Sequence, residues 1–253
     1  MASVGRFQDK VVIVTGGCNG MGKGIVTVFR ENGGKVVIWD IDDETGKSMT
    51  SDVQFFIHCD MTKEKDIKSA VEQTVTKYGS VHCLVNNAGW HPPNHTIDEY
   101  SADEMRKLMD LNFVAYFLAA KYTLPFLRKT KGTIVNIAST AGTYGARLAT
   151  AYCASKAAIS GFTRALALDE ALNGVRVNAV VPGSTNTPLL HSFVHSEDDK
   201  REMEDMSVLR RLGEPEEIGH VCLFLATDAT FVIGQEIHST GGMGVGELYQ
   251  YRK

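Results

Sequence analysis

Short runs of apolar, β-branched residues alternate along this chain with longer segments in which apolar residues recur at helical spacing. The runs cover residues 10–15, 35–40, 54–58, 81–86, 132–138, 175–181 and 236–239. Apolar runs of this length, bounded by glycine or polar turn residues, predict buried strands. The segments between them predict helices, most clearly over 63–78, 101–129 and 150–173. The alternation predicts an α/β fold: a Rossmann-type doubly wound parallel sheet of about seven strands with helices on both faces.

The pattern shows no point at which the chain divides. No linker, repeat or low-complexity stretch interrupts the 253 residues, so we expect a single domain over 1–253. Pro125 predicts a kink or irregularity late in the helix over 101–129, because proline has no backbone N–H to donate. Residues 184–212 are polar and carry no strand pattern, and we expect them to form a substrate loop. The last residues, 243–253, are expected to form a C-terminal tail.

Composition narrows the classes of function. The chain is 43% hydrophobic and 22% charged with a formal net charge of −4, which opposes broad binding to nucleic acid or to an anionic membrane. The N-terminus lacks a signal-peptide core, and no apolar run is long enough to span a membrane. The five cysteines are scattered, which favours free thiols in a cytoplasmic setting. His191 and His195 lack the adjacent glutamate of a helical zinc motif, so we expect no metal.

A glycine-rich stretch, 15–22, follows the first predicted strand and opens a helix. Glycines allow a tight turn and close approach to a pyrophosphate, and the helix N-terminus offers unpaired N–H groups. Asp40 ends the second predicted strand, where a carboxylate accepts hydrogen bonds from ribose hydroxyls and repels a 2′-phosphate. This arrangement predicts NAD rather than NADP as cofactor, although Asp40 alone would also suit a turn.

Two further segments fall at the ends of predicted strands. Asp60 ends the third strand and is expected either to lie against the adenine or to cap the helix that starts near Lys63. Residues 86–89, Asn-Asn-Ala-Gly, follow the fourth strand, and their small side chains let the backbone lie beside a cofactor or form a plain turn. Ligands of open α/β sheets bind at the carboxyl ends of strands, so we expect these segments to meet there.

A tyrosine and a lysine, Tyr152 and Lys156, are four residues apart in the segment expected to be helical. Residues at i and i+4 share one face of a helix. A phenol beside an ammonium is an acid–base pair, because a nearby cation favours the phenolate. The same spacing occurs in ordinary amphipathic helices, so the pair gains meaning from the nucleotide motif elsewhere. Ser139, upstream of Tyr152, is a third candidate.

Taken together and in this order, the motifs resemble those of the short-chain dehydrogenase/reductase family. The resemblance rests on the loop at 15–22, Asp40, the Asp60 segment, 86–89, Asn112, Ser139, the Tyr152/Lys156 pair, Pro182-Gly183 and Thr187. It implies an enzyme that acts on CH–OH groups with NAD. Tyr152 would be the general base in oxidation, Lys156 would stabilise its phenolate, Ser139 would hold the substrate oxygen and Asn112 would position a water.

The resemblance also implies which residues bind cofactor and substrate. The cofactor residues would be Gly16, Asn19, Gly20, Met21, Gly22, Asp40, Asp60, Met61, Asn87, Ala88, Gly89, Tyr152, Lys156, Pro182, Gly183, Thr185 and Thr187. The substrate residues would be His91, Ser139, Tyr144, Arg147, Tyr152 and Leu190. His91 could equally be an exposed loop residue. The tail could close over a pocket or be a frayed terminus.

The substrate implied is a small secondary alcohol or its ketone, either a 17β-hydroxysteroid or a sugar such as L-fucose. A reductase of 3-ketoacyl thioesters is an alternative with the same motifs, and a non-enzymatic NAD-binding protein is another. Members of the family usually form tetramers, so we expect a homotetramer with no nucleic-acid or membrane partner. The helices over 101–128 and 150–173 would pair with their copies.

Overall fold

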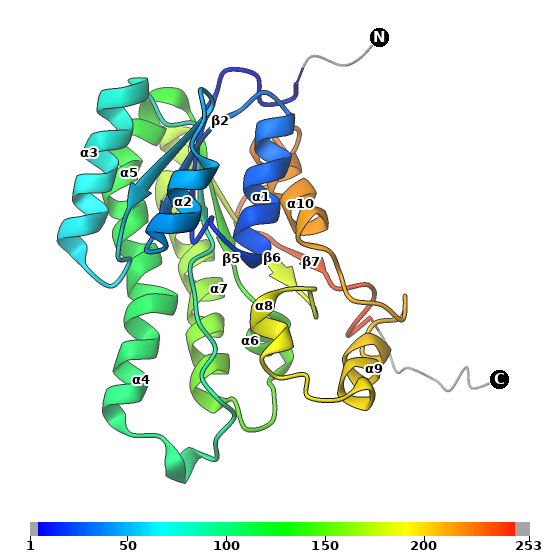
Figure 1. Cartoon of the computed structure of the whole chain (residues 1–253). Helices are drawn as coiled ribbons and strands as arrows, with labels where there is room; N and C mark the ends of the chain where they lie inside the picture. Colours follow the sequence, from blue (N-terminus) through cyan, green and yellow to red (C-terminus); the bar gives the residue numbers. More distant parts are fainter. Residues whose placement is uncertain (1–4, 246–253) are drawn as a thin grey trace.

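A seven-stranded parallel sheet runs through the computed structural model, which describes residues 5–245 (Figure 1). The strand order is β3-β2-β1-β4-β5-β6-β7, and every pair is parallel. The strands are β1 (Val11–Thr15), β2 (Lys35–Asp40), β3 (Gln54–His58), β4 (Cys83–Asn86), β5 (Thr133–Ile137), β6 (Arg176–Pro182) and β7 (Glu236–Ser239). The predicted doubly wound α/β fold is therefore confirmed.

Helices cover both faces of the sheet because every central strand is apolar on both sides. In β1, Val11 and Ile13 belong to one core cluster, whereas Val12 and Val14 belong to the other. The first face is covered by α3 (Glu64–Tyr78), α5 (Ala115–Thr130) and α7 (Thr150–Glu170). The second face is covered by α1 (Gly20–Glu31) and α10 (Pro215–Thr227), which lie side by side (Figure 1).

The long helix expected over 101–129 is divided. It begins as α4 (Ala102–Met109), capped by Ser101 and Glu104. A π-helical turn, Asp110–Val114, then leads into α5. Pro125 lies inside α5 on its exposed side, where water can solvate the carbonyl that loses its partner, and a kink there stays a prediction. The change in helix type lies earlier, at the π turn, a feature that often marks functional positions.

The remaining helices are short. They are α2 (Asp43–Met49), α6 (Thr140–Tyr144), α8 (Pro188–His191) and α9 (Glu197–Asp205). The segment 184–212 contains α8 and α9 and no strand beyond a single bridge from Thr185 to Gly213, in agreement with the expected loop. Of the predicted tail, residues 246–253 lie outside the described chain. No helix within residues 5–245 is both long and apolar enough to cross a membrane.

Candidate functional site

A groove of about 400 Å³ opens at the carboxyl ends of β1, β2 and β4. It brings together predicted cofactor residues that are far apart in the sequence. The predicted residues that line it are Gly16, Asn19, Gly20, Met21, Asp40, Asp60, Met61, Asn87, Ala88, Gly89 and Thr187. The groove therefore lies where parallel sheets bind their ligands.

The glycine loop is shaped by two close contacts. Gly16 has φ of +64°, and a Cβ there would lie 2.9 Å from Ala88 Cα. A Cβ on Gly22 would lie 1.9 Å from the Gly16 carbonyl oxygen, so α1 can start against the loop only with glycine at this position. Asn19 caps α1 by accepting the Gly20 N–H at 2.8 Å. The loop thus presents backbone and a helix N-terminus to the groove, as a pyrophosphate requires.

Asp40 fixes the end of β2 beside this loop. Its Oδ2 accepts the Cys18 N–H at 3.0 Å, and its Oδ1 accepts the N–H groups of Ile41 at 2.7 Å and Asp42 at 3.1 Å. The carboxylate also lines the groove, and no lysine or arginine is among the described residues that line it. A groove with a carboxylate and no cation fits adenosine ribose hydroxyls better than a 2′-phosphate.

Of the two alternatives for Asp60, the helix cap is wrong, because α3 has Lys63 at its N-cap and no side-chain cap bond. Contact with adenine stays a prediction. Asp60 lines the groove, and its Oδ1 accepts the Thr62 N–H at 3.0 Å and the Thr62 hydroxyl at 2.7 Å. Its Oδ2 pairs with Lys63 at 2.9 Å. These bonds, led by that from the Thr62 side chain, lower the pKa of Asp60 to about 2, so the carboxylate stays charged.

Asn112, in the π turn, holds the segment that follows β4. The family resemblance places the nicotinamide at this end of the groove. Asn112 Oδ1 accepts the Trp90 N–H at 2.9 Å, and Asn112 Nδ2 donates to the Trp90 carbonyl at 2.9 Å and to Ser155 Oγ at 3.1 Å. The side chain is fully buried. Asn112 thus ties the segment after β4 to α7, while its role in ordering a water stays a prediction.

Lys156 lies next to this clamp. A Cβ on Gly89, which lines the groove, would lie 3.5 Å from Lys156 Nζ and 3.3 Å from Asn112 Oδ1. The ammonium donates to the Ile137 carbonyl at 3.0 Å, and the residue as a whole is 4% exposed. Burial lowers the pKa of Lys156 from 10.5 to about 8, because desolvation disfavours the charged form.

Tyr152 and Ser139 complete the predicted set. Lys156 Nζ lies 5.9 Å from the centre of the Tyr152 ring. Desolvation raises the pKa of Tyr152 to about 12, and its hydrogen bond with Ser139 acts in the opposite direction. Ser139 also caps α6 by accepting the Ala141 N–H at 3.2 Å. At neutral pH the phenol therefore holds its proton, and acting as a base requires positive charge close to it, which Lys156 can supply.

His91 packs against the Tyr152 ring. The two ring centres are 4.1 Å apart with the rings tilted by 45°, and Phe193 packs edge-on against His91 at 4.7 Å. His91 Nδ1 lies 2.6 Å from the Pro92 carbonyl, so Nδ1 carries the proton and Nε2 is left as an acceptor. Desolvation, aided by the nearby Lys156, lowers the pKa of His91. The structure brings this predicted substrate residue to the candidate catalytic tyrosine.

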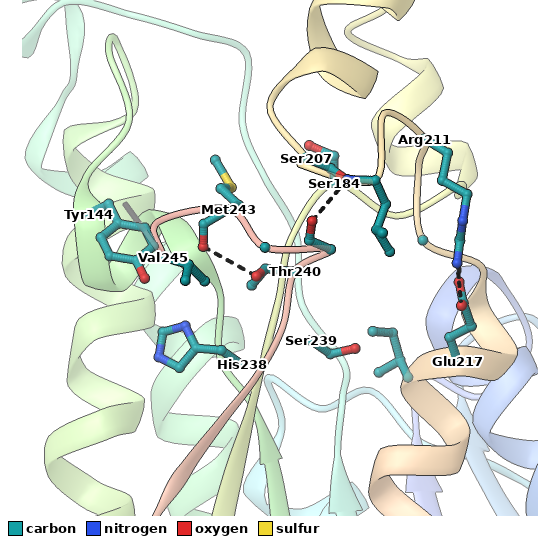
Figure 2. Close-up of a pocket in the computed structure, with 15 residues that line it drawn as sticks. Tyr144, Ser184, Ser207, Arg211, Glu217, His238, Ser239, Thr240, Met243 and Val245 are labelled. Atoms are coloured by element: carbon teal, nitrogen blue, oxygen red, sulfur yellow. Dashed lines mark hydrogen bonds and ion pairs between the residues drawn. The ribbon is translucent and has the colours of Figure 1, made fainter. Parts of the chain in front are cut away.

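Three other predicted substrate residues, Tyr144, Arg147 and Leu190, do not pack against Tyr152 as His91 does. Tyr144 lines a second cavity of about 390 Å³, where Figure 2 shows it beside His238 and Val245. Its ring centre is 6.1 Å from that of His238. Arg147 lies on the surface between α6 and α7. Leu190 is half-buried in α8, next to three residues that line the groove: Thr187, Pro188 and Leu189.

The segment after β6 supports α8. Thr187 caps α8 by accepting the Leu190 N–H at 3.2 Å, and it lines the groove. The other predicted cofactor residues in this segment, Pro182, Gly183 and Thr185, do not line the groove. Thr185 donates to the Gly183 carbonyl at 3.0 Å, and Pro182 pairs with Ser239 of β7. Gly22, Tyr152 and Lys156 likewise do not line the groove, since Gly22 packs against the loop and the other two lie beyond Gly89.

The groove also contains residues that sequence reasoning missed. They are Trp39, Ile41, Cys59, Thr62, Leu111 and Pro188. Most neighbour a predicted residue at a strand end, so widening each motif by one position would have found them. Leu111 directly precedes the predicted Asn112 in the π turn and could have been found in the same way. Among residues 5–245, no cluster of histidine, cysteine and acidic side chains is large enough to hold a metal ion.

Comparisons with known proteins agree with this geometry. A family model described as enoyl-(acyl carrier protein) reductase matches residues 16–244. An L-fucose dehydrogenase of Bos taurus is 42% identical over 252 residues, covering 97% of this chain and 93% of the relative. A meso-2,3-butanediol dehydrogenase of Serratia marcescens is 35% identical, with 94% and 95% covered.

A solved structure is also similar. The ligand-free aldohexose dehydrogenase of Thermoplasma acidophilum superposes with a TM-score of 0.91 at 30% identity, covering 99% of this chain and all of the other. The match extends over the sheet, the groove and the segment that carries Tyr152 and Lys156. The chain is an oxidoreductase that belongs to the short-chain dehydrogenase/reductase family.

Proposed function

We propose that this protein is an NAD-dependent dehydrogenase that interconverts a hydroxyl group of a sugar and the corresponding ketone or lactone. One observation carries the proposal: a buried lysine and a tyrosine lie just past Gly89, at the border of a groove that has a carboxylate and no cation in its described lining. The lysine and tyrosine suit proton transfer, and the groove suits NAD.

Each residue has a defined part in alcohol oxidation. NAD, held by the glycine loop and Asp40, would accept the hydride from the alcohol carbon. Tyr152 takes the hydroxyl proton, and the positive charge of Lys156 favours the phenolate that this step needs. Ser139, which faces the same phenol, holds the substrate oxygen. In the reverse direction Tyr152 returns the proton.

The substrate class is supported by His91 and by the relatives. The free Nε2 of His91 is an acceptor beside Tyr152, which suits a substrate with a second hydroxyl next to the reacting one. Relatives named L-fucose, aldohexose and 2,3-butanediol dehydrogenase act, by those names, on polyhydroxylated molecules. L-fucose is therefore the first substrate to test. A 17β-hydroxysteroid remains an expectation from sequence resemblance.

A substrate panel tests this proposal. Purified protein with NAD⁺ is offered L-fucose, other aldoses, a vicinal diol, 17β-hydroxysteroids and 3-hydroxyacyl thioesters, and NADH formation is followed by absorbance. L-fucose or a related aldose is expected to give the highest kcat/KM, and His91→Ala is expected to raise KM for sugars more than for a monoalcohol. Turnover of thioesters with none of the sugars would replace the proposal with the ketoacyl alternative.

Replacing Asp40 by Asn is expected to lower the preference for NAD over NADP about tenfold or more. The amide keeps one acceptor oxygen for the N–H groups that the two carboxylate oxygens now bind, and it removes the charge that opposes a 2′-phosphate. The measurement is the ratio of kcat/KM values for the two cofactors. Asp43→Asn, an exposed carboxylate paired with His58 outside the groove, is the matched control. Equal ratios in both variants and the parent would contradict the role of Asp40.

Assembly and location follow from surface chemistry. Phe117 of α5 is exposed and its ring lies 6.1 Å from that of Phe162 on α7, which supports a homotetramer formed by these helices. All five cysteines are free, which supports a reducing, cytoplasmic setting. The substrate is a small molecule, and no nucleic-acid or membrane partner is proposed.

A further inference from the structure

A second tyrosine lies beside the Lys156 ammonium. Tyr116, at the start of α5, is fully buried, and its hydroxyl donates to the Ile137 carbonyl at 3.3 Å. Lys156 Nζ donates to the same carbonyl at 3.0 Å. The phenol and the ammonium therefore converge on one oxygen, at the end of the strand that leads to Ser139.

The ring of Tyr116 also contacts the charge. Lys156 Nζ lies 5.7 Å from the centre of the Tyr116 ring and 5.9 Å from that of Tyr152. A cation within about 6 Å of a ring centre is attracted by the quadrupole of the ring, and the attraction grows when water is excluded. Burial raises the pKa of Tyr116 well above its usual value, so its hydroxyl remains a donor.

The buried ammonium has few other means of stabilisation. Among the described residues its one hydrogen-bond acceptor is the Ile137 carbonyl, and no carboxylate pairs with it. The titratable groups that face the ammonium are Tyr152, Tyr116 and His91. The two phenols are neutral when protonated and the imidazole is neutral or positive, so none of the three serves as a counter-ion. A buried charge without a counter-ion depends on oriented dipoles and ring faces.

We propose that Tyr116 is a positioning residue that holds the Lys156 ammonium in place for the reaction. Its ring stabilises the charge, and its hydroxyl fixes the carbonyl to which the ammonium is bonded. This inference rests on the proposed function, in which Lys156 acts on Tyr152. The alternative is that Tyr116 only fills the small core cluster that it shares with Ala138, Ile159, Ala179 and Val181.

The test reads the ionisation of Lys156 directly in the cofactor-free protein. The protein is labelled with [¹³Cε]lysine, and the Lys156 signal is assigned by its loss in Lys156→Met. Tyr116→Phe keeps the ring and is expected to leave the Lys156 pKa within about 0.3 units of the parent. Tyr116→Met fills the space without a ring and is expected to lower it by about half a unit to one unit.

Activity provides the second readout. In alcohol oxidation, Tyr116→Met is expected to lower kcat about tenfold and leave KM for NAD⁺ within twofold, because less of the enzyme holds the charged lysine with an ionised Tyr152. If this variant does not fold, 3,4,5-trifluorophenylalanine at position 116 keeps the shape of the ring and weakens its quadrupole, and the same pKa shift is expected.

A matched control separates positioning from packing. Phe113 packs against the same cluster without contacting Lys156, so Phe113→Met is expected to lower stability and leave the Lys156 pKa unchanged. An unchanged Lys156 pKa in both ring-altering variants, or an equal shift in Phe113→Met, would overturn the inference. Absence of turnover in the parent would overturn the proposed function. The Lys156 pKa could still be measured, because the NMR titration needs no substrate.

Discussion

Tyr152→Phe is expected to reduce kcat by about a thousandfold or more while NAD⁺ binding stays unchanged. The substitution removes one hydroxyl from a side chain that does not line the cofactor groove, so the loss falls on proton transfer. Initial rates of NADH formation measure kcat, and NAD⁺ affinity is measured separately by quenching of protein fluorescence. Proton transfer by a positioned side chain contributes typically 10²–10⁴-fold, which sets the expected scale.

The control for this experiment is another tyrosine hydroxyl. Tyr122 of α5 bonds to Glu64 on the surface, and Tyr122→Phe is expected to retain full activity. If Tyr152→Phe kept activity within a few-fold of the parent, the proton would have to leave by another group. His91, whose ring lies 4.1 Å from that of Tyr152, would then be the first to test.

Lys156→Met is expected to abolish turnover and yet raise the free energy of unfolding. The pKa of Lys156 falls from 10.5 to about 8 on folding, so burying the ammonium costs about 3 kcal/mol at pH 7. Methionine removes that cost and keeps the apolar length of the side chain. Catalytic residues often reduce stability in this manner, since the site is built for the reaction.

The lowered pKa of Lys156 also predicts how the stability difference between parent and variant changes with pH. Below pH 8 the lysine is charged in both states and the full cost is present. Between about pH 8 and pH 10.5 the unfolded chain binds more protons than the folded one, so the stability of the parent rises with pH. The advantage of Lys156→Met is therefore expected to shrink over this range and vanish above it.

Chemical denaturation at pH 7 and pH 10, at matched protein concentration, measures this difference. Lys107→Met, on the exposed side of α4, is the control and is expected to change stability by less than about 0.5 kcal/mol. A loss of stability in Lys156→Met at pH 7 would mean that bonds to the ammonium outweigh its desolvation.

The layered architecture could be predicted from the pattern of residues along the chain. Strands such as Val11–Thr15 are buried at every position and apolar at all but the last, and a strand with two buried faces needs helices on both sides. The glycine loop was predictable for the same kind of reason, because a Cβ at Gly16 or Gly22 would come too close to Ala88 or to the Gly16 carbonyl oxygen. The cofactor groove followed from these local requirements, since parallel strands place their ends at one edge.

The assembly of the candidate catalytic end depends on packing between elements and could not be predicted from the sequence. The π turn at Asp110–Val114 directs Asn112 onto Trp90, which carries His91 against Tyr152, and local propensity does not reveal such a turn. The placement of Tyr144 in a second cavity and of Tyr116 against Lys156 likewise depends on contacts between distant segments. Sequence spacing fixes which residues share one helix or strand, whereas packing between elements fixes which side chains meet across them.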